Sequence, residues 1–352
     1  MVPLPAIALS SASRKPVGVL LAPLMLLAGA LVLTALVLLL AGFPPGPALG
    51  ALVSGSVGSV DAFVSGTLVR TTPLLLTGLA VTLAFRAGLL NIGAEGQLLA
   101  GACAATAVGV TASSSGVLAL PLALLAGAAT GALWAGIAGV LRSKFSVHEV
   151  ISTLMLNFIA LHVTGWLVRG PLQEPTGIYP QSAGITEAAR LPLIASGTRL
   201  HWGVVIAALA ALVSGWVLHH HWAGFRLRAA GANPFAALSA GRVNVGRLTL
   251  RVFLISGAIA GLAGAVELTG VTYALYENFS PGWGYTAIAV ALLARLDPWL
   301  TVPSALLFGA LQAGAGAMQR DAGVPLVVVS VVEALLILAV LAMARLRSDG
   351  EA

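Results

Sequence analysis

The residues best suited to chemistry lie in a short polar string, NIGAEGQ at residues 91–97, between apolar runs rich in Ala and Leu. Asn91, Glu95 and Gln97 supply hydrogen-bond donors and acceptors there, and the two glycines of the string weaken a helix at the same point. Such mixed groups can replace the hydration water of a hydroxyl-rich solute, or they can bond to another part of the protein. Two roles therefore stay open for Glu95: a contact for a passing polar solute, and a latch between two parts of the molecule.

A second loosened string, FSPGWGYTA at residues 279–287, has a comparable place in the second half of the chain. Its Pro and Gly residues disfavour a regular helix, while Trp283 and Tyr285 supply flat aromatic faces. These faces can stack on a base or sugar ring, although Trp and Tyr also anchor helices at membrane–water interfaces. We predict that Trp283 and Tyr285 lie beside a solute path together with the polar side chains of 91–97.

A third polar group consists of Glu149, Thr153 and Asn157, which recur at i, i+4 and i+8 and so share one helix face. This stripe can line a polar path or form interhelical hydrogen bonds, and both interpretations stay open for Asn157. Glu149 follows closely on basic residues, which favours an ordinary helix-end charge. Glu267 and Glu333 are further ionisable groups in apolar runs, where such groups by default face a bundle interior or a water-filled path.

The basic internal loop 219–248 contains the string GANPFAALSAG. Asn233 suits the N-cap, Pro234 the first helical position and Gly241 the C′ end, so we predict a two-turn helix over 234–240. The apolar face of this helix consists of Phe235, Ala236 and Leu238. A helix of this kind can lie on lipid or press into a groove of a cytoplasmic protein.

Composition indicates the class of protein in which these groups lie. The 352 residues are 59% hydrophobic and 9% charged with a mean hydropathy of +1.00, whereas soluble domains carry roughly a quarter charged residues. The chain is therefore predicted to be a membrane protein. Its net charge of +6 comes from basic residues scattered at the ends of apolar runs, without the patch that nucleic-acid binding requires.

Sequence motifs argue against catalysis by this chain. The phosphate-binding GxxxxGK[ST] string, the GxSxG nucleophile elbow and the HExxH zinc pair are all missing from the sequence. The run His219–His220–His221 is interpreted as a polar helix end rather than a metal site. We expect no catalytic residues, no metal site and no cofactor of the chain's own.

Apolar runs of about 20 residues predict an all-α membrane protein with about ten transmembrane helices. The predicted spans are 17–42, 62–85, 89–111, 117–141, 147–168, 202–218, 249–272, 283–295, 299–318 and 324–344. Two of them have features typical of broken or partly re-entrant helices. The span 62–85 contains Arg70 and Pro73, and 283–295 is too short to cross alone.

Charge distribution predicts the topology of a single transmembrane domain, 17–345, between cytoplasmic tails at 1–16 and 346–352. Ten spans place thirteen of the eighteen basic residues on the cytoplasmic side together with both termini. The remaining five, on the outer side, are Arg70, Arg169, Arg190, Arg199 and Arg320. The long external loop 169–201 suits contact with a soluble partner, and a passive connector is the alternative.

A weak internal repeat supports an inverted arrangement. The string beginning PLALLAGAATGALWAG at Pro121 is similar to the one beginning PSALLFGALQAGAGA at Pro303. If these are spans 4–5 and 9–10, the repeat unit is five helices. Because five is odd, the two five-helix repeats have opposite topology, with the solute path between them.

Five separated strings carry a resemblance to a known family: RAGLLNIGAEGQLLAG, HEVISTLMLNFIA, RGPLQEP, RAAGANPFAALSAGRVNV and GYTAIAVALLAR. Together they resemble the permease subunits of bacterial ABC importers for nucleosides and simple sugars, a family that includes ribose and branched-chain amino-acid permeases. The resemblance implies a location in the bacterial inner membrane and a second, related permease subunit. It also implies an external solute-binding protein and separate cytoplasmic ATPases that bind ATP. Ribose permeases differ at NIGAEGQ, so their ligand contacts do not transfer.

Within this resemblance the helix at 234–240, with Asn233, Pro234, Phe235, Ala236 and Leu238, corresponds to the coupling helix that docks on the ATPase. The alternative function is a secondary transporter in which Glu95, Glu267 or Glu333 couples a small polar solute to a proton. An integral-membrane enzyme is a third class, and no motif favours it.

Overall fold

The computed structural model describes residues 29, 32–112, 116–239, 244–332, 334–335 and 337–339. Outside the helices, these residues form only three isolated β-bridges. The predicted all-α class is therefore confirmed. The two tails, Glu333, Ala240 and Gly241 lie outside the described residues, as do parts of the first and last predicted spans.

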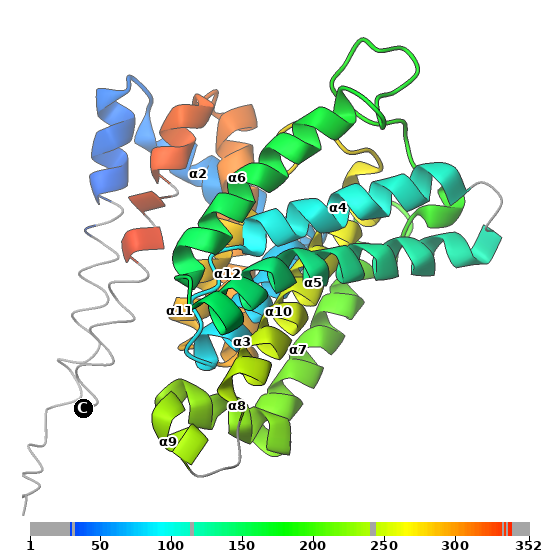
Figure 1. Cartoon of the computed structure of the whole chain (residues 1–352). Coiled ribbons are helices and arrows are strands. Elements are labelled where there is room, and N and C mark those ends of the chain that lie inside the picture. The colour runs from blue at the N-terminus through cyan, green and yellow to red at the C-terminus, as the bar shows by residue number, and fades with distance from the viewer. Residues whose placement is uncertain are drawn as a thin grey trace, which may run out of the picture.

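The helical elements follow one another with short connections, except for the loop between α6 and α7 (Figure 1). In chain order they are α2 (Pro45–Val57), η1 (Ala62–Leu68), α3 (Val69–Arg86), α4 (Ala94–Thr111), η3 (Gly116–Leu118), α5 (Ala119–Phe145), α6 (Glu149–Val168), η4 (Glu187–Ala189), α7 (Gly203–His220), α8 (Trp222–Ala232), α9 (Pro234–Ser239), α10 (Val245–Glu267), η5 (Leu268–Thr272), α11 (Trp283–Leu293) and α12 (Pro298–Asp321).

Six helical runs among the described residues are long and apolar enough to cross a membrane, which makes this a multi-pass membrane protein. They are Ala62–Arg86, Gly116–Phe145, Glu149–Val168, Gly203–His220, Val245–Thr272 and Pro298–Asp321, and each coincides with a predicted span. The predicted span 89–111 appears as α4, which is not among the six. At 11 residues α11 extends roughly 16 Å, about half the hydrocarbon thickness. The count of ten and the inverted repeats stay predictions.

The suggested break in the span 62–85 is wrong, because Ala62–Arg86 forms one continuous helical run of 25 residues. The first turns, η1, are π-helical and end at Leu68, directly before Val69. In a regular helix the ring of Pro73 collides with the Val69 carbonyl, and a wider π-helical turn next to that point relieves the collision. The helix therefore contains Pro73 without ending there.

Two helices were not predicted. The sequence of α2, PGPALGALVSGSV, is too short for a span and rich in residues that favour turns, yet α2 packs against α12. The internal loop contains α8 in addition to the expected α9. Both helices lie in segments without a long apolar run, so the apolar pattern of the sequence does not indicate them.

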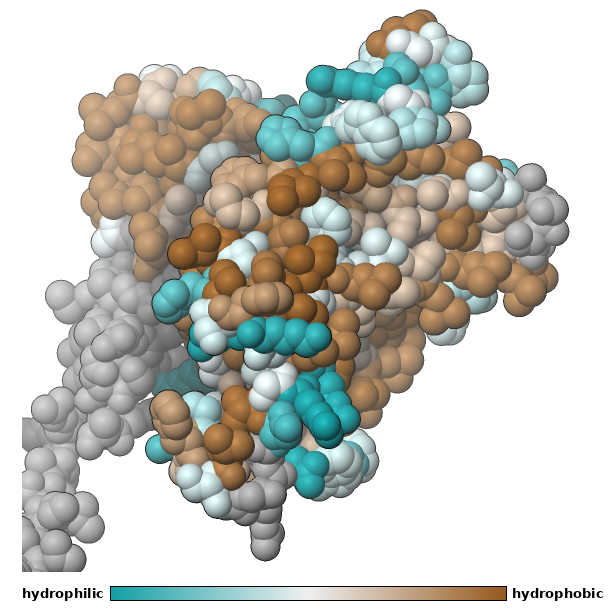
Figure 2. All heavy atoms as spheres, in the orientation of Figure 1, coloured by the Kyte–Doolittle hydropathy of each residue, from teal (hydrophilic) through white to brown (hydrophobic). Residues whose placement is uncertain are grey.

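Burial separates inner from outer helices. In the runs Ala62–Arg86 and Val245–Thr272, 83% and 72% of the most apolar stretch is buried inside the protein, against 22% in Gly116–Phe145. The outer helices thus present apolar side chains outward, and Figure 2 shows hydrophobic residues over much of the visible face. Hydrophilic residues gather at the loop after α6 and near α8 and α9. This pattern matches helices surrounded by lipid.

The helices α4, α5 and α10 pack backbone against backbone through glycines. A Cβ atom on Gly131 of α5 would lie 2.6 Å from the Cα of Gly261 on α10, and a Cβ on Gly261 would lie 2.8 Å from the Cα of Gly131. Gly101 of α4 meets the backbone of Gly261 as well. Small residues allow this close approach in membrane proteins, where van der Waals packing drives helix association.

Candidate functional site

The string 91–97 leads into α4 and forms a buried network. The Oδ1 atom of Asn91 accepts hydrogen bonds from the Gly93 amide and from Gln97 Nε2, both at 2.9 Å. Its Nδ2 atom donates to Ser256 Oγ on α10 at 2.9 Å, and that hydroxyl donates to the Ala80 carbonyl on α3 at 2.8 Å. Asn91 and Gln97 are almost completely buried. The string therefore joins three helices through side chains whose polar atoms are satisfied.

Asn157 of α6 bonds to the same string from the other side. Its Oδ1 atom accepts from the Gly96 amide and its Nδ2 atom donates to the Ile92 carbonyl, both at 2.9 Å. The Nδ2 atom also lies 3.4 Å from the Tyr285 hydroxyl. A side chain that satisfies two main-chain groups holds a loop in place, as the interhelical interpretation of this residue requires.

Glu95 connects the two loosened strings. Its Oε2 atom accepts a hydrogen bond of 2.7 Å from the Gly284 amide at the start of α11, and its carboxylate also accepts from the Ser280 hydroxyl. The backbones touch here too, because a Cβ on Gly284 would lie 2.5 Å from the Cα of Glu95. In this structure the carboxylate thus makes the contacts expected of a latch between 91–97 and 279–287.

Next to these strings lies a cavity of about 970 Å³, which falls in the range of small-molecule sites. It is lined by α3, the end of α10, the 276–281 segment, α11, α12 and the apolar helix after it. Of the six predicted path residues only Trp283 lines this cavity, with its Nε1 atom 3.3 Å from Gln312 Oε1. The other five residues do not line it, and their place in the solute path stays a prediction: Asn91, Glu95, Gln97, Asn157 and Tyr285.

Three charged residues line the cavity: Arg70, Arg199 and Glu267. Glu267 was predicted among the intramembrane carboxylates, whereas Arg70 was taken as a sign of a broken helix and as one of the outer-side basic residues, not as a site residue. An arginine inside an apolar run is itself a signal of a functional path, so the sequence does contain a feature that indicates Arg70 as a site residue. Arg199 comes from the loop before α7, and its amide donates to Ser65 Oγ at 3.2 Å. No sequence pattern predicted that Arg199 would lie close to Ser65 and Arg70.

Three arginines that the charge-based prediction assigned to the outer side lie near one another, while the topology itself stays a prediction. The side chains of Arg70 and Arg320 both approach Gly316 on α12, and Arg70 and Arg199 line the same cavity. All three were predicted to lie on one side of the membrane. The structure thus brings together residues that only the positive-inside rule had grouped.

The loop 169–201, predicted to be external, is hydrogen-bonded to η5 and to the residues directly after it. Its amides at Ser182, Ile185 and Leu191 donate to the carbonyls of Leu275, Tyr273 and Thr269 at 2.7–2.8 Å. His201 packs beside Gly270 and accepts a hydrogen bond from the Gly203 amide at 3.1 Å through Nδ1. Burial lowers the pKa of this imidazole to about 4, and the nearby charge of Arg199 acts in the same direction. The loop is therefore fixed beside the cavity, and its Arg199 forms part of the cavity wall.

Other predicted groups have simpler contacts. The carboxylate of Glu149 pairs with Arg142 Nε at 3.1 Å, which confirms a helix-end charge. His219 pairs with Asp297 at 2.9 Å. The part of the chain that the structure describes contains no cluster of three or more His, Cys, Asp or Glu side chains placed to hold a metal ion.

The predicted helix in the internal loop is present as α9. Asn233 caps it, with Oδ1 accepting from the Ala236 amide at 3.0 Å. Phe235 and Leu238 are 80% and 57% exposed, so their apolar side chains have no cover in this chain. Just before α9, Gly231 lies against the backbone of Arg86 at the end of α3.

Residues 63–341 match the family described as branched-chain amino acid transport system / permease component. The chain belongs to this family of transporter permeases. It is a transport subunit and not an enzyme, consistent with the lack of catalytic motifs in its sequence. The residues that approach one another around the cavity all fall within the matched region.

Three relatives within this permease family are informative. The guanosine ABC transporter permease protein NupP of Bacillus subtilis is 41% identical over 92% of this chain and 93% of its own length. The glucose ABC transporter permease protein TsgB13 of Haloferax volcanii is 40% identical over 82% of each chain. A second guanosine permease protein of Bacillus subtilis, NupQ, is 28% identical over 72% of this chain and 81% of its own.

Proposed function

We propose that this chain is the transmembrane permease subunit of an ABC importer and forms the path for a nucleoside. The observation that carries the proposal is the 970 Å³ cavity, because its wall combines aromatic faces with hydrogen-bonding groups. Trp283 and Tyr276 suit stacking on a base, while Gln312 and Asn278 suit ribose hydroxyls. The high identity to a guanosine permease supports the same substrate class.

A simple sugar is the second candidate, supported by the 40% identity to a glucose permease. A sugar has hydroxyls for the amides of the cavity and an apolar ring face for an indole, but it lacks a base. Nucleoside uptake should therefore depend more strongly on the aromatic side chains than sugar uptake does, and substitutions at these side chains distinguish the two solutes.

In the proposed mechanism the solute enters beneath the external loop, crosses the cavity and leaves when the two halves of the chain change position. The 91–97 and 279–287 strings lie where the halves meet, and the Glu95–Gly284 hydrogen bond connects them. In this mechanism Asn91, Gln97, Asn157 and Tyr285 become accessible to solute only in another conformation. A change at Glu95 then alters the start of α11 and thereby the position of Trp283.

ATP hydrolysis acts on this path through α9, the proposed coupling helix. Its exposed Phe235 and Leu238 suit a groove on a cytoplasmic ATPase. The contact between Gly231 and Arg86 joins the internal loop to the turn that precedes residue 91. Motion of α9 thus reaches the polar string through one short stretch of backbone.

The proposal includes the finer architecture: ten transmembrane helices in two inverted five-helix repeats, in a bacterial inner membrane, with both termini in the cytoplasm. Each half contains one π-helical segment, η1 and η5, on a long buried helix beside the cavity. The partners are a second permease, a solute-binding protein outside and ATPases that bind ATP. The two guanosine permease proteins of Bacillus subtilis support a heterodimer.

Uptake by the reconstituted complex tests the function. Proteoliposomes containing the chain, its second permease, the ATPase and the binding protein should accumulate radiolabelled guanosine with ATP inside, and glucose much less. Trp283→Ala should abolish guanosine uptake, and Trp283→Phe should retain part of it because the aromatic face remains. Accumulation driven by a proton gradient without the ATPase would establish the secondary-transporter alternative instead.

Co-purification tests the coupling helix separately. Phe235→Asp and Leu238→Asp should each release the ATPase while leaving the chain inserted in the membrane. Val117→Asp is the matched control, since Val117 is 91% exposed at the far end of α5 from the predicted cytoplasmic side. Retention of the ATPase by both α9 variants would remove α9 from this role.

A further inference from the structure

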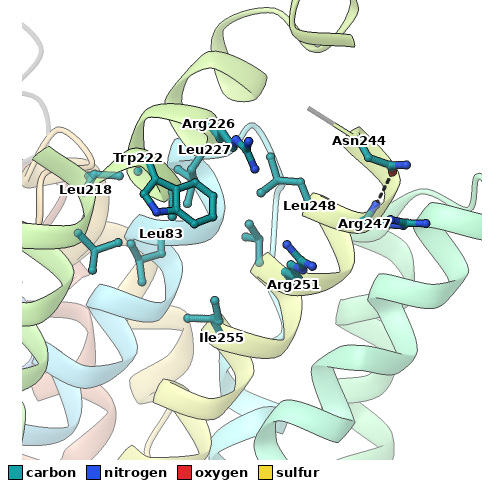
Figure 3. Close-up of a pocket in the computed structure, with 14 residues that line it drawn as sticks. Leu83, Leu218, Trp222, Arg226, Leu227, Asn244, Arg247, Leu248, Arg251 and Ile255 are labelled. Carbon is teal, nitrogen blue, oxygen red and sulfur yellow. Dashed lines mark hydrogen bonds between the residues drawn. The ribbon is translucent and has the colours of Figure 1, made fainter. Parts of the chain in front are cut away.

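A second cavity, of about 370 Å³, lies between α3, α7, α8 and α10 (Figure 3). One wall is α8, with Trp222 and Arg226, and the facing wall is α10, with Arg247, Arg251 and Ile255. The cavity lies near the end of the bundle that carries α8 and α9, away from the proposed solute path. Neither the transport function nor any predicted motif accounts for it.

The charged side chains that line this cavity are all positive. Arg226, Arg247 and Arg251 line it, and no Asp or Glu does. The ion pairs that Glu149, Glu277 and Asp297 form do not involve these arginines. The N-terminus of the 23-residue helix α10, capped where Asn244 Oδ1 accepts from the Arg247 amide at 3.0 Å, adds partial positive charge. An anion therefore fits this end of the cavity, and bidentate arginines suit a phosphate.

The rest of the lining is apolar and continues onto the lipid-facing surface. Leu83, Leu218 and Leu248 line the interior, and Ile255, which is 55% exposed, lies about two turns beyond Leu248 along α10. Trp222 is 59% exposed and carries Arg226 over its ring at 4.6 Å. Trp in this position, between a charged cluster and an apolar surface, is typical of the membrane interface.

We propose that this cavity binds one anionic phospholipid. The three arginines hold the phosphate of the headgroup, and the first part of an acyl chain follows Leu248 and Ile255 along α10 toward the bilayer. A basic pocket between transmembrane helices on the cytoplasmic side is a known physical basis for headgroup recognition. Because α8 leads into α9, the bound lipid joins the internal loop to α10 and holds the proposed coupling helix in position.

Native mass spectrometry of the purified full-length chain tests the proposal. The chain is mixed with phosphatidylglycerol or with phosphatidylcholine of the same acyl chains, and retained lipid is counted. We expect retention of one phosphatidylglycerol in preference to phosphatidylcholine, with each arginine changed to Gln weakening binding about fivefold. Lys144→Gln, which removes an exposed cytoplasmic-side charge elsewhere on the chain, should bind like the wild type.

A second variant separates lipid binding from misfolding. Ile255→Trp fills the apolar part of the cavity and keeps all three arginines, so it should also lose phosphatidylglycerol while its melting temperature without lipid stays that of the wild type. Inorganic phosphate should compete only weakly, because it has no acyl chain for the apolar wall. Full competition by phosphate would show a free-anion site and overturn the lipid assignment.

Two further results would overturn the proposal. Equal retention of the two lipids by the wild type would mean that the arginines recognise no headgroup. Loss of ATPase co-purification by Arg226→Gln with unchanged lipid retention would identify the cavity as a protein-docking surface.

Discussion

The two sides of the long helix α10 differ in how they are packed. On one side, which we call the closed side, α10 meets α4 and α5 through glycines at backbone contact, and the polar groups of 91–97 are satisfied by Ser256 and Asn157. On the other, the cavity side, the end of α10 and α3, α11 and α12 surround about 970 Å³ lined by charged and amide side chains.

This difference shows that polar residues in an apolar chain have two distinct uses. On the closed side they replace backbone hydrogen bonds at a loosened helix and make the packing specific. On the cavity side they face an open volume, where a solute can bind to them. In the proposed mechanism the closed side moves as one body while the cavity side changes shape, as alternating access requires.

The largest expected effect comes from Gly261→Ala on the closed side. The added methyl group meets the backbone of α5, which cannot move aside as a side chain does, so we expect a loss of about 3 kcal/mol of stability. The thermal midpoint in detergent measures this loss. Gly46→Ala in α2 is the control, since no heavy atom lies within 4 Å of its added Cβ. Equal midpoints for the two variants would contradict the backbone packing.

Glu95→Ala tests the bond between the two sides. It leaves the Gly284 amide and the Ser280 hydroxyl without an acceptor, which costs about 2 kcal/mol, and it should greatly reduce uptake. Glu95→Gln retains one acceptor oxygen and should restore part of both properties. Wild-type uptake and stability in the alanine variant would show that the latch is dispensable.

Glu267→Gln tests the cavity side alone. The carboxylate lines the cavity with Arg70 and Arg199, so we expect about a tenfold loss in uptake, equivalent to one hydrogen bond to a charged group. The thermal midpoint should change little. Glu277→Gln provides the control, because its carboxylate pairs with Arg169 outside this cavity. A change in midpoint as large as that of Glu95→Ala would assign Glu267 to the closed side.

The smallest effect concerns pH and His201, where the external loop meets η5. The folded protein binds a proton here only near pH 4, whereas the unfolded chain binds it near 6.5. The stability contributed by the neutral imidazole is therefore present above pH 6.5 and is lost as the pH falls toward 4. Between pH 7.5 and 6 we expect a decrease of about 1 kcal/mol.

Melting at the two pH values measures this decrease, and His201→Gln should reduce the difference because its amide does not titrate in this range. An unchanged difference in the variant would assign the pH dependence to other groups.

Much of the fold was predictable because its signals are local. Runs of apolar residues identified the six long helices, and the Asn–Pro string identified α9 with its cap. The break suggested by Arg70 and Pro73 was wrong, since Ala62–Arg86 is one continuous helical run in which a π-helical segment ends just before Val69 and the Arg70 side chain lines the cavity. The short helices α2 and α8 were missed because their stability depends on packing against other helices rather than on their own composition.

The sequence by itself determined that this chain is helical, that it spans a membrane several times and that it belongs to a permease family. These properties follow from composition, from the spacing of apolar residues and from strings that resemble a known family. Only the tertiary structure decided which polar residues face each other. Glu95 and Gly284 are 189 positions apart, and Arg70, Arg199 and Glu267 come from three separate segments. Hydrogen bonding and desolvation depend on distances in space, and the local sequence does not encode these distances.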